Sequence, residues 1–202
     1  MKDVNIIINL AINFDEIMKV GKCNISKVGF KTRAGNNVFG GRKTNQDSNL
    51  QLVNILDTRM CIFGVFDGHG EQGHRCSGAI KNYLINYFSN SSLYSEDMSL
   101  INSSIIYEKL VENKHEKLIY AYHSTENYLQ KQKFDSFFSG STAVIIIILG
   151  IKDNKFNLDN KIICVNSGDS RAIMSHKGDL KSYNCVKLII NLQKFLFKLG
   201  FP

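Results

Sequence analysis

The sequence has very little proline and no tryptophan: its single proline, Pro202, is the last of the 202 residues. It also has no CxxC pair, which argues against a zinc ribbon or a thioredoxin-type redox motif. The five cysteines are scattered and odd in number, as expected of reduced thiols. These absences favour a protein of the cytoplasm or the nucleus over a disulfide-stabilised secreted domain.

Long apolar segments and dense blocks of positive charge are also missing. The apolar stretch at residues 6–12 is too short to span a bilayer, and acidic Asp15 and Glu16 follow it, so we expect no stable membrane insertion. The 25 lysines and arginines exceed the 18 acidic residues, for a net charge of +7, but they are dispersed. Nucleic acid is therefore not expected as a partner, whereas a phosphate-bearing substrate would suit this charge.

The apolar residues, 44% of the chain, are sufficient for one domain with a hydrophobic core. Their spacing predicts two helices, at residues 77–90 and 103–131, the second capped by Ser103 or Ser104. Shorter apolar runs predict strands at residues 50–56, 60–66, 143–149, 161–165 and 172–174. Because strands and helices do not alternate along the chain, we predict an α+β fold with an antiparallel sheet packed by helices.

One predicted strand ends in the tetrapeptide Asp67-Gly68-His69-Gly70. A carboxylate at the end of a strand is fixed in position yet reaches solvent, and Gly68 leaves its carbonyl uncovered. Such oxygens suit a hard cation, Mg²⁺ or Mn²⁺, and His69 could donate a proton near neutral pH. The alternative is an Asp-Gly turn that has His69 as a bystander.

Two further groups of polar residues accompany this tetrapeptide. Arg42 could bind a phosphate while Asp47, in the same polar loop, holds metal-bound water; alternatively the two are a solvated surface pair. Downstream, Asp169 lies in a turn between apolar runs, where it could contribute a third carboxylate or simply form an Asx-type turn.

Four segments occur in order along the chain: GRKTNQDS from Gly41, FGVFDGHG from Phe63, SGSTAV from Ser139 and VNSGDSRA from Val165. In order and wording they resemble the metal-dependent Ser/Thr protein phosphatases of the PP2C type (PPM family). The resemblance covers roughly two-thirds of the chain. It implies a PP2C-like sandwich of two antiparallel β-sheets flanked by helices, with two or more Mg²⁺ or Mn²⁺ ions at one edge.

The resemblance also implies roles for the polar residues. Asp67 would bridge the metals, Gly68 would offer its carbonyl, Asp47 would act through water, and Asp169 would help to hold a further ion. A metal-activated water would then attack the phosphate in line, without a covalent enzyme intermediate.

The residues that would face the substrate are implied in the same way. Arg42 matches the family's phosphate-binding arginine, and His69 would be the general acid for the leaving alkoxide. The sequence has no Cys-x5-Arg segment, which argues against a cysteine-dependent phosphatase.

The sequence departs from the family pattern at two places. Gln46 stands where many relatives carry glutamate, and no aspartate follows Asp179, although the family would supply two more metal ligands. We therefore expect a leader at residues 1–30, a partial phosphatase domain at 31–180, its C-terminal part missing, and a divergent tail at 181–202. The tail fits a terminal core helix, a basic amphipathic helix or the translation of an intron.

The sequence leaves two main hypotheses for function. The first is metal-dependent hydrolysis of phosphoserine and phosphothreonine in phosphoprotein substrates, by a monomer. The alternative is a catalytically inactive, truncated phosphatase-like module that binds phosphoproteins or a partner. A zinc site made by His69, His74 and Cys76 is a third possibility, although its spacing lacks a partner knuckle.

Overall fold

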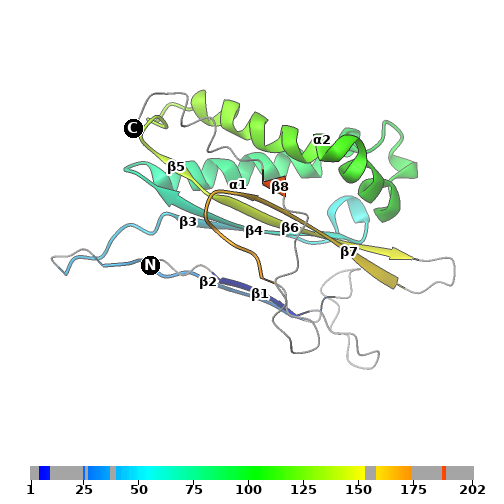
Figure 1. Ribbon diagram of the computed structural model, residues 1–202, viewed down its shortest axis with the longest axis horizontal. Coiled ribbons are helices and arrows are strands. Elements are labelled where there is room, and N and C mark those ends of the chain that lie inside the picture. Colours follow the sequence, from blue (N-terminus) through cyan, green and yellow to red (C-terminus); the bar gives the residue numbers. More distant parts are fainter. Residues whose placement is uncertain are drawn as a thin grey trace.

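The main sheet contains four of the five strands that the apolar runs predicted. A computed structural model describes residues 5–9, 25, 27–36, 40–152, 158–173 and 188–189. Within these, the strands are β3 (Asp47–Leu52), β4 (Met60–His69), β6 (Ala143–Lys152), β7 (Leu158–Ser167) and β8 (Leu188–Ile189) in that spatial order, with β5 (Gly140–Ser141) beside the end of β4. Neighbouring strands are antiparallel except β7 and β8, which are parallel (Figure 1).

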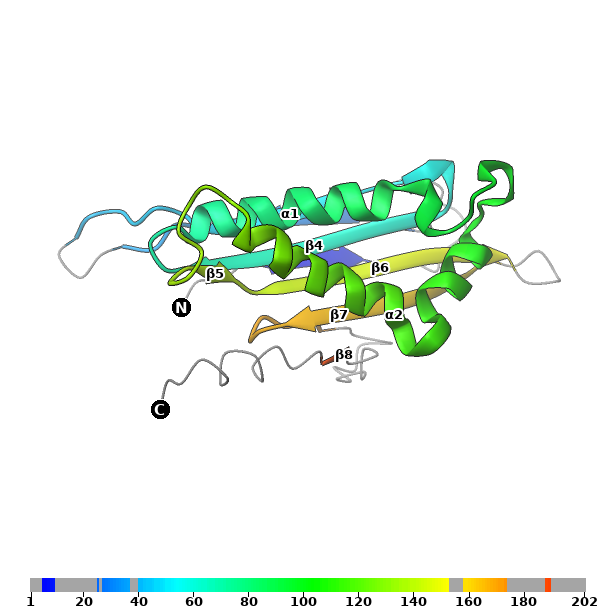
Figure 2. The same cartoon turned by 90° about the horizontal axis from the view of Figure 1, so that it is seen from above.

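Two helices cover one face of this sheet. The helix α1 (Gly73–Ser89) lies over β3 and β4, and α2 (Ser103–Gln130) lies over β6 (Figure 2). Alternate residues of β6, such as Ile145 and Ile147, are buried under the helices because successive side chains of a strand point to opposite faces. From α2 the buried Tyr122 hydroxyl donates to the carbonyl oxygen of Val165, which ties the helix to β7.

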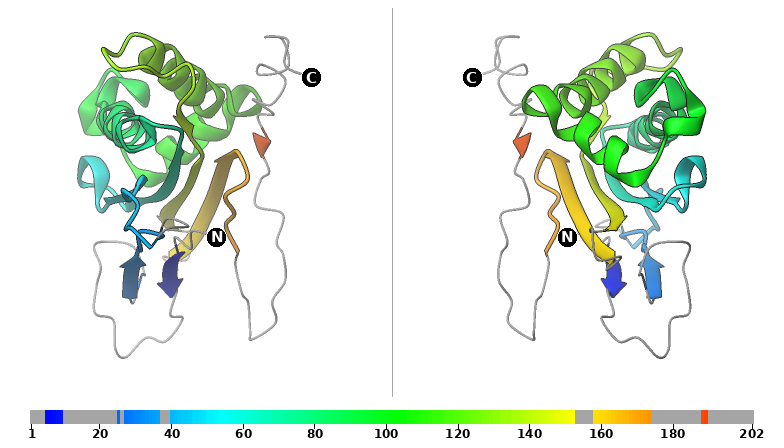
Figure 3. Two further views of the ribbon diagram at one scale, coloured as in Figure 1. Left: turned by 90° about the vertical axis from the view of Figure 1, so that its left-hand side faces the viewer. Right: turned by 90° about the vertical axis from the view of Figure 1, so that its right-hand side faces the viewer.

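The opposite face of the sheet packs against the N-terminal part of the chain. Strands β1 (Asn5–Asn9) and β2 (Lys27–Lys31) form a separate two-stranded antiparallel ribbon on this side, away from the helices (Figure 3). Ile25, fully buried, packs with Cys61, Phe63 and Ile148 of the main sheet. The predicted α+β fold with an antiparallel sheet packed by helices is thus confirmed.

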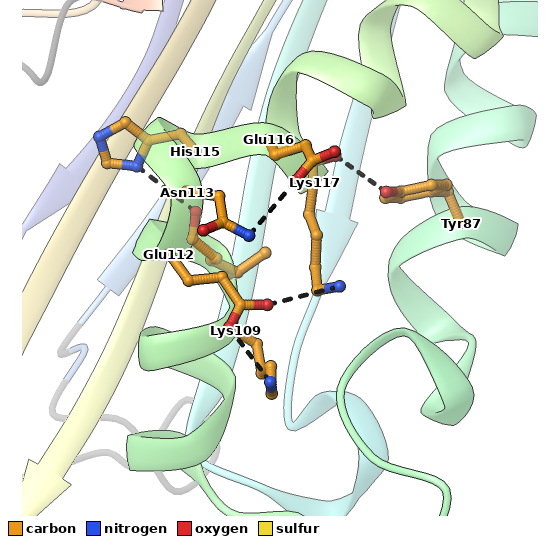
Figure 4. A network of polar contacts seen from close by, with 8 residues as sticks. Tyr87, Lys109, Glu112, Asn113, His115, Glu116 and Lys117 are labelled. Atoms are coloured by element: carbon orange, nitrogen blue, oxygen red, sulfur yellow. Dashed lines mark hydrogen bonds and ion pairs between the residues drawn. The ribbon is translucent and has the colours of Figure 1, made fainter.

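The helix α2 is broken near its middle. Residues 113–115 have left-handed φ values of 48° to 66°, which stops the helical backbone. The carboxylate of Glu112 lies 3.1 Å from the ammonium nitrogen of Lys109 and 3.6 Å from that of Lys117, so it links the two halves. Tyr87 of α1 donates to the carbonyl oxygen of Lys117 at 2.8 Å (Figure 4). The contact across the helices fixes the second half of α2 where it begins.

Two local predictions differ from the structure, and a third falls largely outside the described residues. The cap of α2 is Asn102, whose side-chain oxygen accepts from the backbone N–H groups of Ser104 and Ile105, so the expected Ser103 or Ser104 cap is wrong. The strand expected at residues 172–174 does not form at 172 and 173, because the chain leaves the sheet at the turn after β7. The tail at residues 181–202, for which a helix was one interpretation, lies outside the described residues apart from Leu188 and Ile189, which form β8.

Short 3-10 helices join the larger elements: η1 (Ile55–Asp57), η2 (Ser91–Leu93) and η3 (Met98–Leu100). η1 lies between β3 and β4, so the connection of this antiparallel pair is longer than a tight hairpin turn. Among the residues described, no helix has the length and apolar character needed to cross a membrane.

Candidate active site

Two carboxylates face each other where β3 begins and β4 ends. The strand register places Asp47 directly opposite Asp67, and residues paired in this way project from the same face of a sheet. Like charges in directly opposite positions are destabilising unless something neutralises them. The pairing therefore favours a cation at this edge.

The environment of Asp47 supports the same conclusion. One carboxylate oxygen, Oδ2, accepts a hydrogen bond from the Thr32 hydroxyl at 2.9 Å. The other, Oδ1, is buried and has no hydrogen-bond partner. A buried carboxylate oxygen without a partner is unfavourable, and a hard divalent cation prefers such a ligand. The residues at this edge thus fit the Mg²⁺ or Mn²⁺ that the sequence resemblance implies.

Gly68 lets the end of β4 touch the beginning of α1. A methyl group at Gly68 would lie 2.3 Å from the carbonyl oxygen of Gly73 and 2.5 Å from that of Gln46, both backbone atoms. The backbone N–H of Gly68 donates to the same Gln46 carbonyl at 3.2 Å. Only glycine fits at this position, and the close contact fixes the residue that follows Asp67.

The turn after Gly68 is held from two sides. Gly70 has a left-handed φ of 79°, and its carbonyl oxygen accepts a hydrogen bond from the side-chain amide of Gln46. On the other side, a methyl group at Gly70 would lie 2.4 Å from the carbonyl oxygen of Phe138. A glutamate carboxylate at position 46 could not donate this bond, so the amide of Gln46 has a structural role in this chain.

His69 lies at the exposed tip of β4, opposite Gly140 of β5. A methyl group at Gly140 would lie 2.9 Å from Nε2 of His69, so the imidazole rests over the glycine backbone. The ring is therefore supported on one side and open to solvent. That placement suits a group that exchanges protons with a bound substrate.

Thr142 connects Asp67 with the turn that carries Asp169. Its backbone N–H donates to the Asp67 carbonyl oxygen at 2.9 Å, and its hydroxyl oxygen accepts from the Asp67 N–H at 3.1 Å. The same hydroxyl lies 2.6 Å from that of Ser170, and Gly168 packs against the Thr142 side chain. These contacts make Thr142 a structural link at the edge of the site.

Two of the predicted site residues, Asp169 and Arg42, are not grouped with Asp47 and Asp67. Asp169 is exposed in the turn after β7, and within the described parts of the chain no group of three Asp, Glu, His or Cys side chains is placed to hold a metal ion. Arg42 is exposed, in an isolated β-bridge with Asn36. The structure thus brings together Asp47, Asp67 and Gly68, while the roles of all the predicted site residues stay predictions.

The zinc site suggested by His69, His74 and Cys76 is wrong. Both imidazoles are exposed, whereas Cys76 is fully buried in the core under the helices, and the three form no metal-binding group. Burial, with a smaller contribution from Glu126 and Asp135, raises the pKa of the Cys76 thiol. A thiol that keeps its proton is a poor metal ligand.

Sequence reasoning missed the residues that support the site. Thr32 bonds the Asp47 carboxylate, and the buried Ser77 hydroxyl donates to the Gln46 carbonyl oxygen at 2.6 Å. No motif indicated either residue, because each acts through one contact with a distant part of the chain. Thr142 lay inside a recognised segment, but its bond to Asp67 was not foreseen.

Fold and site together define an α+β protein with a candidate divalent-cation centre where β3 begins and β4 ends, at one edge of the sheet. The family model for protein phosphatase 2C matches residues 35–186. A relative from Arabidopsis thaliana, "Probable protein phosphatase 2C 72", is 31% identical over 150 residues, which make up 72% of this chain and 40% of that protein. "Probable protein phosphatase 2C 38" of Oryza sativa subsp. japonica is 26% identical over 183 residues, 76% of this chain and 38% of that protein.

The chain belongs to the protein phosphatase 2C family, because the family model matches well over half of it. A second relative from Arabidopsis thaliana, "Probable protein phosphatase 2C 35", is 30% identical over 136 residues, 67% of this chain and 32% of that protein. The chain thus spans about two-fifths or less of the length of these three relatives. No solved structure matches the chain at a comparable level.

Proposed function

We propose that this chain carries a metal-dependent centre that hydrolyses phosphoserine and phosphothreonine in proteins. The observation that supports it best is the pairing of Asp47 with Asp67 across β3 and β4, with one buried Asp47 oxygen lacking a partner. A Mg²⁺ or Mn²⁺ ion held there would neutralise phosphoryl oxygens and supply an activated water. Family membership supports a phosphatase, and with it a phosphoprotein substrate.

The chain's own residues have distinct roles in this proposal. Asp47 and Asp67 would hold the cation, and the Gly68 carbonyl would be a further oxygen ligand. Arg42, exposed in the preceding loop, binds the phosphate of the substrate with its guanidinium. His69 gives a proton to the oxygen of the leaving serine or threonine, which would otherwise depart as an unstable alkoxide. Asp169, exposed in the turn after β7, would help to hold a further ion.

A second candidate function is a phosphoprotein-binding module without catalytic activity. It is favoured by one observation: within the described residues, no third acidic side chain, histidine or cysteine joins Asp47 and Asp67 to form a metal-binding group. Two carboxylates would hold a cation weakly, yet Arg42 could still bind a phosphate. The two functions are distinguished by turnover.

Replacing His69 with alanine tests whether this residue is the general acid. We expect the wild-type chain to release phosphate from a phosphothreonine peptide only when Mn²⁺ is present. The His69→Ala variant should lose about 10²-fold in kcat on this peptide, the usual contribution of a general acid. It should lose less than about tenfold on p-nitrophenyl phosphate, whose phenolate leaves without a proton. Colorimetric phosphate and nitrophenol assays measure both.

The outcomes distinguish the two candidate functions. Equal losses on both substrates would show that His69 is not the general acid. A folded wild-type chain that binds the phosphopeptide but never releases phosphate, at any Mn²⁺ concentration, would exclude hydrolysis and favour the binding module. Circular dichroism of the wild-type and variant chains establishes that both are folded.

A further inference from the structure

Two exposed phenylalanines lie beside the candidate active site. Phe137 and Phe138, in the loop between α2 and β5, expose 68% and 72% of their surfaces. Their rings pack edge to face, with centroids 4.8 Å apart, so they form one continuous aromatic surface. Large apolar residues exposed side by side are unfavourable in water and often mark a contact surface.

The loop that presents this aromatic pair is anchored on both sides. Before the pair, Phe134 packs against the core, and the guanidinium of Arg75 lies 5.4 Å from its ring centroid. The N–H of Phe137 donates to the carboxylate of Asp135 at 2.9 Å. After the pair, the buried Ser139 hydroxyl accepts from the N–H of Gln72 at 2.9 Å. The exposure of the rings is therefore a feature of an ordered loop, which reduces the entropy lost when a partner binds.

The aromatic pair is also continuous with the site. The Phe138 carbonyl oxygen lies against Gly70, in the turn that follows Asp67, and Gln72 begins the segment that leads into α1. A peptide whose phosphate reached the end of β4 would therefore have neighbouring side chains close to the two rings. The chemistry of the rings selects for an apolar neighbour.

We infer that Phe137 and Phe138 form a contact surface for an apolar side chain that flanks the phosphorylated residue of the substrate. The inference rests on the proposed function only in that the ligand is a phosphopeptide; it holds for a catalytic site and for a binding module. It makes the loop between α2 and β5 a determinant of substrate choice.

The test is a binding measurement that does not require turnover. Fluorescent peptides carry a nonhydrolysable phosphonate in place of phosphothreonine and have either leucine or serine at each flanking position in turn. Fluorescence anisotropy gives the Kd of each peptide for the 202-residue chain with Mn²⁺. We expect leucine to improve Kd about fivefold at one or more positions, as half-burial of one aliphatic side chain would.

Two variants complete the experiment. The double variant Phe137→Ser/Phe138→Ser should reduce the preference for leucine to within about twofold. The matched control is Met98→Ser/Leu100→Ser, which removes two apolar side chains of similar exposure, 67% and 55%, from η3. The control should keep the full preference.

Two outcomes would overturn the inference: no preference for leucine at any position in the wild-type chain, or a preference that persists in the Phe137→Ser/Phe138→Ser variant. Failure of the proposed function appears elsewhere, as absence of phosphate release in the hydrolysis assay. The two failures are therefore distinguishable.

Discussion

Replacing Asp67 with asparagine is expected to lower Mn²⁺-dependent phosphate release from a phosphothreonine peptide by about 10³-fold. Asparagine keeps the size of the side chain but removes the negative charge opposite Asp47. The loss corresponds to about 4 kcal/mol of transition-state stabilisation, the several kcal/mol that a catalytic cation supplies. Initial rates at saturating Mn²⁺ measure the effect.

The matched control for this variant is Asp97→Asn. Asp97 is also an aspartate, but it is fully exposed and accepts a hydrogen bond from the N–H of Ser99 at the beginning of η3. Its substitution should leave the rate within about twofold of wild type, as for a surface position away from the site. If the Asp67→Asn variant had the same rate as the control, Asp67 would not be part of the catalytic centre.

Replacing Gly68 with alanine is expected to lower the free energy of unfolding by about 3 kcal/mol or more. The added methyl group would lie 2.3 Å from the Gly73 carbonyl oxygen and 2.5 Å from that of Gln46. Both are backbone atoms, so relief requires β4 and α1 to move apart, and overpacking of this kind is strongly destabilising. Urea denaturation followed by circular dichroism measures the change.

Gly78→Ala is the internal comparison for this prediction. Gly78 lies inside α1, and a methyl group there would meet nothing within 4 Å. Alanine stabilises a helix interior relative to glycine, so this variant should gain about 0.5–1 kcal/mol in free energy of unfolding. If Gly68→Ala unfolded at the same urea concentration as wild type, the result would contradict a close contact between β4 and α1 at this residue.

The strands and helices were largely predictable because burial imposes a pattern of apolar residues on the sequence, either periodic or continuous. The run from Ala143 to Leu149 is apolar throughout, and in the structure both faces of β6 are covered, by the helices on one side and by the N-terminal segment on the other. The spacing of apolar residues did not predict the first turn of α1, because His74 and Arg75 are polar and exposed. The buried residues of α1 therefore predicted the helix, but they did not predict its polar first turn.

The break in α2 also could not be predicted from the spacing of apolar residues. Leu110 and Leu118 are both fully buried, so the apolar stripe continues across the break and predicts one uninterrupted helix. The polar residues between them were the signal that was available, but polar residues are equally usual on the exposed face of a helix. Only the left-handed backbone of residues 113–115 reveals the interruption.

The candidate metal ligands could be predicted from the sequence, but the hydrogen bonds that position them could not. Asp67 and Gly68 end an apolar run, and this local pattern is visible in the sequence. The contacts that position them join residues far apart in the chain: Gln46 bonds Gly70 across 24 positions, and Thr142 bonds Asp67 across 75. No spacing within one segment encodes such pairs, because they depend on how the strands assemble.

Binding of Mn²⁺ to the 202-residue chain, measured by isothermal titration calorimetry, tests the central claim most directly. The facing aspartates predict a measurable Kd for the wild-type chain and a Kd at least about tenfold weaker for both Asp47→Asn and Asp67→Asn. The Asp97→Asn control should match wild type. Equal Kd values in all four chains, or no binding to the folded wild-type chain, would contradict a divalent-cation centre between β3 and β4.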